Sequence, residues 1–164
     1  MKYHYMRTPK KAAFSILEVM VACGMLAVAA AAAVGTLTRM NNNASLSRLQ
    51  TGASTVAQER IDRVLEDGPF NPKKNQVPPF LAIPSGNTAT QTVGTESNPT
   101  IPIYTDPDTN EVVVAGWLTS TITKTTRTYG PWDMELRYVD VTVNYKYRGK
   151  TYSIRMSTVR SPDA

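Results

Sequence analysis

One stretch near the start decides how this chain is organised: Lys10-Lys11-Ala12-Ala13-Phe14-Ser15-Ile16-Leu17-Glu18, with the apolar run that follows it to Leu37. The 20 residues from Val19 to Thr38 carry no charge. At about 1.5 Å per residue, a helix of that length spans about 30 Å, the thickness of the hydrocarbon core of a bilayer. Residues 14–38 therefore predict a membrane-spanning helix.

Glu18 is the charged residue at the start of this run. A carboxylate beside lipid costs on the order of 2–3 kcal/mol, so charged groups in membranes usually have a partner of opposite charge. The run itself offers no basic residue before Arg39. Either a basic group from elsewhere pairs with Glu18, or the side chain reaches the lipid headgroups from a single anchor.

The residues Ala13-Phe14-Ser15-Ile16-Leu17-Glu18-Val19-Met20-Val21-Ala22 resemble the class III signal of type IV pilin-like proteins, which include pilins and type II secretion pseudopilins. The resemblance covers roughly residues 8–40. It implies that a prepilin peptidase cleaves between Ala13 and Phe14 and methylates the new N-terminus. It also implies that Glu18 pairs with the α-amino group of an adjacent subunit and sets the register of a filament.

Two residues depart from the usual pattern of that family. Ala13 stands where the family usually has glycine; alanine is small enough for such a site, so slower cleavage is expected. Gly35 stands where many major pilins have a helix-breaking proline. Glycine softens a helix without removing a hydrogen-bond donor, so melting of this segment on assembly is not implied.

Charge is unevenly distributed along the chain. The formal net charge is +5, and the leader, residues 1–13, holds four basic residues and no acid. A basic leader stays in the cytoplasm. The sequence therefore predicts a single-pass protein of the inner membrane whose C-terminal domain lies outside the cytoplasm, and a periplasmic or cell-surface filament after assembly. An ordinary secretory signal cut near Ala33 is the alternative, and it leaves Glu18 unexplained.

Beyond Arg39, apolar residues recur at three- and four-residue steps and predict an amphipathic helix over residues 39–67. These residues are Leu46, Leu49, Ala53, Val56, Ala57, Ile61, Val64 and Leu65. The triplet Asn41-Asn42-Asn43 interrupts the pattern and predicts a soft joint where the helix leaves the bilayer. Asp67-Gly68-Pro69 predicts the end of the helix.

The remainder divides into an irregular, proline-rich connection over residues 68–110 and an antiparallel sheet over residues 111–164. Short strands near Val77–Ile83 and Thr100–Tyr104 are further expectations within the connection. Strands are predicted at Glu111–Thr123 and Met134–Tyr147, and a return strand follows the turn Arg148-Gly149-Lys150. The predicted fold class is α+β, in which a long N-terminal helix, half membrane and half amphipathic, packs on a C-terminal antiparallel sheet as in pilins.

No enzyme site emerges, and no cofactor is predicted. His4 is the single histidine and Cys23 the single cysteine, so no His/Cys metal site or Ser–His nucleophile is expected beyond residue 23. Asp106, Asp108 and Asn110 have the one-three-five spacing of a calcium loop. Glu111 replaces the usual glycine, which favours an Asp/Asn-rich turn over a calcium site.

The C-terminal region is basic, with eight basic and three acidic residues over positions 124–160. Its nucleic-acid candidates are Lys146, Arg148, Lys150 and Arg155, which lie near several aromatic residues. The tyrosines alternate onto the predicted core face and the basic residues, including Arg160, onto the solvated face. That arrangement is typical of an ordinary amphipathic strand, so DNA is an unfavoured partner.

The predicted function is that of a structural subunit of a type IV pilus or a type II secretion pseudopilus. The absence of a C-terminal cysteine pair resembles minor pilins or pseudopilins more than many major pilins. The expected partners are the prepilin peptidase/N-methyltransferase, other pilin or pseudopilin subunits, and the inner membrane. The alternatives are a DNA-binding or adhesive tip pilin, and a plain secreted or anchored β-domain protein.

Overall fold

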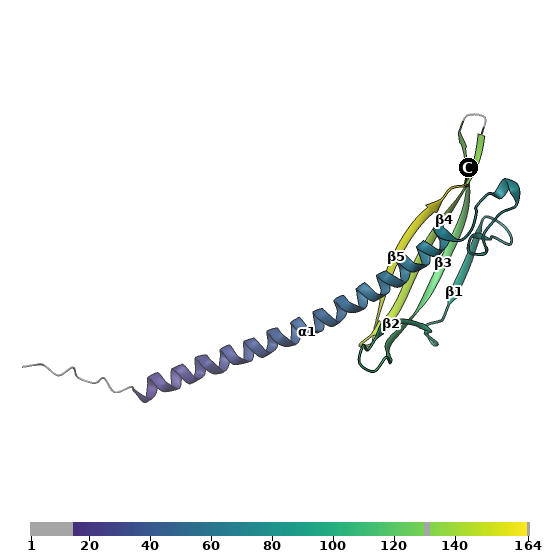
Figure 1. The fold of residues 1–164 in the computed structure, drawn as a ribbon. Coiled ribbons are helices and arrows are strands. Elements are labelled where there is room, and N and C mark those ends of the chain that lie inside the picture. Colours follow the sequence, from purple (N-terminus) through teal and green to yellow (C-terminus); the bar gives the residue numbers. More distant parts are fainter. Residues whose placement is uncertain (1–14, 130–131, 164) are drawn as a thin grey trace, which may run out of the picture. The chain divides into compact units, whose positions relative to one another are not determined.

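The computed structural model describes residues 15–129 and 132–163 of the chain. It contains one long helix and five strands (Figure 1). The elements are α1 (Ile16–Glu66), the 3-10 helices η1 (Pro72–Lys74) and η2 (Pro79–Leu81), β1 (Thr88–Val93), β2 (Ile101–Thr105), β3 (Val112–Tyr129), β4 (Trp132–Tyr147) and β5 (Lys150–Arg160). The chain divides into two compact units between Ala44 and Ser45.

The described part of the first unit is the N-terminal portion of α1. Every side chain from Ser15 to Asn41 is exposed, including large apolar ones such as Met25, Leu26 and Val28, each about 70% exposed. This segment is long and apolar enough to cross a membrane. The predicted apolar helix is confirmed; Phe14, its predicted first residue, lies outside the described residues.

The helix runs without interruption through Asn41, Asn42 and Asn43. The soft joint predicted at this triplet stays a prediction, and the secondary structure there is helical. Asparagine is a modest helix former, and it lowers helix stability without preventing the backbone hydrogen bonds. The boundary between the two compact units falls one residue after this triplet, between Ala44 and Ser45.

In the second unit, the C-terminal portion of α1 lies across one face of the sheet (Figure 1). Its buried residues are Leu49, Ala53, Ala57, Ile61 and Val64, which follow the predicted three- and four-residue steps. Leu65 is 43% exposed, so its predicted place on the packed face is wrong. It follows Val64 directly, and a rotation of about 100° per residue carries it off the buried stripe.

The sheet is antiparallel and has the order β1-β3-β4-β5, while β2 also pairs with β3. Val139, Val141, Val143 and Tyr145 are fully buried against the helix, and the residues between them point to the opposite face. This is the period-two pattern that predicted β4 and β5. The α+β layout is therefore confirmed.

Two expectations for residues 68–110 are corrected by the structure. The polar segment Thr88–Val93 forms β1, and β2 (Ile101–Thr105) confirms the short strand expected near residues 100–104, so the region is less irregular than predicted. The strand expected at Val77–Ile83 is instead the 3-10 turn η2, because Pro78 and Pro79 cannot donate to a ladder.

A glycine allows close packing between α1 and β2. Ile103 bulges out of the β2–β3 register and is 5% exposed. A Cβ atom added to Gly52 of the helix would lie 2.1 Å from the Ile103 carbonyl oxygen. Only glycine fits where the two backbones approach this closely.

The C-terminal end of α1 is completed by a residue from the last strand. Arg160 Nη1 donates to the carbonyl oxygens of Val64 (2.6 Å) and Asp67 (3.3 Å), and Arg160 Nη2 donates to that of Gly68 (2.5 Å). The last backbone carbonyls of a helix have no hydrogen-bond donor within the helix, so the Arg160 guanidinium donates to them instead. Gly68 has φ 61° and ends the helix as predicted.

Candidate functional site

The first turn of α1 holds Glu18, the residue predicted to guide assembly. Ser15 precedes the helix, and its Oγ accepts a hydrogen bond from the Leu17 backbone N–H at 3.3 Å. Glu18 follows three residues later and is exposed. Serine at the N-cap with glutamate at the third helical position is the sequence pattern of a capping box.

This pattern provides a local role for Glu18 that the sequence analysis missed. A carboxylate in the first helical turn interacts favourably with the backbone N–H groups and the helix dipole, by about 0.3–1 kcal/mol. Among residues 15–129 and 132–163, no basic side chain forms an ion pair with Glu18. Ala13 and Phe14, the predicted processing residues, lie outside the described residues.

The calcium candidate forms the turn between β2 and β3. Asp106 N–H donates to the Glu111 carbonyl (2.9 Å), and Asn110 N–H donates to the Asp106 carbonyl (2.8 Å). The Asp108 N–H donates to Asp106 Oδ1 at 2.9 Å, so this carboxylate caps its own turn. Within the described chain, no group of three or more His, Cys, Asp or Glu residues could hold a metal ion.

The predicted nucleic-acid residues do not form one cluster of free cations. Lys146 Nζ lies 2.8 Å from Glu96 Oε1, and Arg155 Nη2 lies 3.1 Å from Asp140 Oδ2. Arg148 lies in the β4–β5 turn with its guanidinium 5.3 Å from the Tyr147 ring centroid, and Lys150 begins β5. Two of the four positive charges are therefore matched by carboxylates.

Arg160, expected on the solvated face, is buried on the helix face, and this is a correction. It pairs directly across the ladder with Arg137, and the two residues are 7% and 5% exposed. Each guanidinium lies 5.8 Å from the Phe70 ring centroid. The signal was available, because Arg160 has the same strand parity as Tyr152, Ile154 and Met156.

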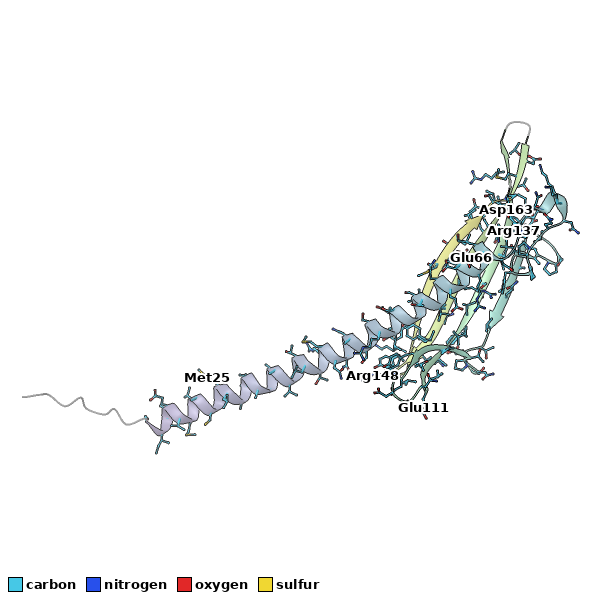
Figure 2. All side chains as sticks on the ribbon, in the orientation of Figure 1. Met25, Glu66, Glu111, Arg137, Arg148 and Asp163 are labelled. Carbon is cyan, nitrogen blue, oxygen red and sulfur yellow. The ribbon has the colours of Figure 1, made fainter. Side chains whose placement is uncertain are left out.

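A cavity of about 570 Å³ lies near these arginines. Figure 2 shows Arg137 and Asp163 at this end of the sheet, and Glu111 and Arg148 at the other. Three of the residues that line this cavity are acidic, and each of their carboxylates already has a hydrogen-bond or ion-pair partner. Asp133 accepts from Thr128 (2.6 Å), Asp163 accepts from the Phe70 N–H (2.7 Å), and Glu135 pairs with Lys124 and Arg137. These carboxylates are therefore engaged in contacts within the fold.

Comparisons of the chain with protein-family models, with curated proteins and with solved structures find no match.

Proposed function

We propose that this chain is a subunit of a pilin-like filament, either a type IV pilus or a type II secretion pseudopilus, and that it is a minor component of it. The observation that carries the proposal is the combination of the Phe14–Glu18 motif with the helix that follows it. One continuous helix joins an exposed apolar segment of membrane length to a packed domain. Such a helix suits a subunit that is stored in a membrane and then bundled with its neighbours.

The proposed mechanism begins with insertion into the inner membrane, with the basic leader in the cytoplasm and the sheet domain outside it. The prepilin peptidase then cleaves between Ala13 and Phe14 and methylates the new amine. That amine, on a neighbouring subunit, pairs with Glu18. Neither charge is stable alone in an apolar environment, so the pair mainly selects the register of docking.

Small residues support close contact between the bundled helices. Ala27 and Ala29–Ala33 lie on an exposed part of α1, together with Gly24 and Gly35. Small side chains allow helix backbones to approach closely in a membrane. Alanine also has a high helix propensity but gains little from contact with lipid, so extraction into a filament costs less than for a leucine-rich anchor.

The processing step is tested by mass spectrometry of the mature N-terminus in cells that carry a prepilin peptidase. The expected product begins at methylated Phe14. A product that begins well beyond Phe14, for example near Ala33, would be an ordinary secreted protein and would refute the proposal.

The role of Glu18 is tested by Glu18→Gln, because glutamine also fits a capping box but has no charge. The variant is expected to remain in the membrane. Its amount in sheared filaments is expected to be at least tenfold below that of wild type. Glu66→Gln, an exposed change in the same helix, is the matched control and should assemble normally. Normal incorporation of Glu18→Gln would show that Glu18 acts only as a helix cap.

A further inference from the structure

The face of the sheet opposite α1 carries a regular array of hydroxyl groups. On this outer face, Thr88, Thr90 and Thr92 of β1 lie directly opposite Thr123, Thr121 and Thr119 of β3. Residues of the same face continue the array onto β4 and β5, namely Thr142, Asn144, Thr151, Ser153 and Ser157. All of these side chains are exposed or partly exposed, whereas Ile122 and Val143 on the helix face are fully buried.

The geometry of the strands makes this array regular. Neighbouring strands lie about 4.8 Å apart, and alternate residues along a strand lie about 6.6 Å apart. The β3–β4 and β4–β5 registers run without a bulge. The outer face therefore presents hydroxyl and amide groups on four strands, and the ion pair of Arg155 with Asp140 lies among them.

The charges on the outer face cancel over the array. Arg155 is paired with Asp140, and Lys146 with Glu96. Nucleic acids are bound mainly through phosphate contacts with basic residues, so a face with matched charges is poorly suited to them. A neutral, hydroxyl-rich partner loses less on desolvation at such a face than a charged one.

Trp117 supplies a flat aromatic group at one side of the array. It lies directly opposite Asn144, which in turn lies opposite Ser153, so an indole, an amide and a hydroxyl form one row. Trp117 is partly exposed. A pyranose ring has an apolar C–H face and a rim of hydroxyl groups, and this row offers a complementary surface for both.

We propose that the outer face around Trp117, Asn144 and Ser153 binds an extended neutral polysaccharide, of the flat ribbon type represented by cellulose and chitin. The sugar rings lie along the row that begins at Trp117, and their hydroxyl groups exchange hydrogen bonds with the neighbouring threonine and serine side chains. The site does not depend on leader cleavage or on assembly.

The test is sedimentation of the purified full-length chain with cellulose and with chitin, in a detergent that has no sugar headgroup. Wild type is expected to pellet with at least one of the two, with little change between low and high salt. Trp117→Ala should weaken binding at least tenfold, and Asn144→Ala and Thr119→Val should weaken it severalfold. Tyr104→Phe, an aromatic change at a residue packed against the core, is the control and should bind normally.

Urea unfolding of each variant separates loss of binding from loss of fold, and Thr119→Val keeps the shape of the side chain if Trp117→Ala does not fold. Absence of wild-type binding to both polysaccharides would overturn the proposal. Equal binding by Trp117→Ala and wild type would also overturn it. Binding that disappears at high salt and is competed by duplex DNA would instead identify the basic turn as a nucleic-acid site.

Discussion

The two portions of α1 are both α-helical, but they differ in how many of their side chains are buried. From Ser15 to Asn41 every side chain is exposed, whereas from Leu49 to Val64 five residues are buried beneath a sheet. Composition also separates them, because Val19–Thr38 carries no charge and is rich in alanine, whereas the second portion alternates apolar and charged residues. The difference is that the second portion is covered by a sheet from its own chain, whereas no other described residue covers the first portion.

The largest expected difference between the two portions comes from placing one charge in each. Ala57→Asp puts a carboxylate at a fully buried position, and an unpaired buried charge typically costs 3 kcal/mol or more, so the sheet domain should unfold. Ala30→Asp should leave urea unfolding of the domain unchanged and should reduce membrane insertion by about 2.5–3.5 kcal/mol. A folded Ala57→Asp domain would contradict the packing described for α1.

The next effect concerns the end of the helix. Arg160→Met keeps the length of the side chain but leaves the carbonyls of Val64, Asp67 and Gly68 without their donor, and should lower the free energy of unfolding by about 3 kcal/mol. Arg155→Met breaks an exposed ion pair and should cost less than about 1 kcal/mol. Equal losses in urea unfolding would show that Arg160 does not hold the helix end.

A smaller effect is expected from two matched glycine changes. Gly52→Ala should destabilise the domain by about 1–3 kcal/mol, because the new methyl group meets the Ile103 carbonyl. Gly35→Ala adds a methyl group in open space and should raise helix stability by up to about 1 kcal/mol. Circular dichroism and urea unfolding measure both changes, and a neutral Gly52→Ala would argue against close contact between α1 and β2.

The smallest effect at neutral pH belongs to Tyr145. It is fully buried, and among the described residues its hydroxyl has no hydrogen-bond partner. Tyr145→Phe should therefore change the free energy of unfolding at pH 8 by no more than about 1 kcal/mol.

At high pH the same substitution should become stabilising. Burial, and then the neighbouring Tyr152, raises the pKa of Tyr145. The neutral phenol is favoured in the fold, so its contribution is fully present below the unfolded pKa of about 10 and is lost as the pH rises through the folded pKa. Tyr145→Phe should shift alkaline unfolding to higher pH, and an unchanged midpoint would exclude this cause.

The sequence predicted those elements whose apolar residues repeat with a clear period. The buried stripe of α1 and the alternation of β4 and β5 are of this kind. It did not predict β1, because one face of Thr88–Val93 carries three threonines and the other carries Gln91 between Ala89 and Val93, so the apolar alternation is weak. It also misplaced Arg160, because a basic side chain was assigned to the solvated face against its strand parity. The carbonyls that Arg160 binds lie 92 to 96 residues away, so nothing in the sequence indicated the partners that allow its burial.

Prediction of the candidate site from the sequence was limited in the same way, because the roles of its residues depend on element boundaries and on residues distant in the chain. Ser15 and Glu18 were visible in the sequence, but the capping role required knowledge of where α1 begins. The outer face was not predicted because its threonines come from separate strands. Only the register that pairs Thr121 with Thr90 brings them into one array.

The contact between Arg160 and the end of α1 also has a consequence for the order in which the chain folds. The helix is synthesised before β5, and the contact between Arg160 and Val64 closes a loop of 96 residues. Closing a loop of this length costs conformational entropy, so contacts between such distant residues form slowly. If the domain folds after crossing a membrane, the helix end stays incomplete until β5 has emerged, and a chain truncated before Arg160 would be exposed to proteolysis at this point.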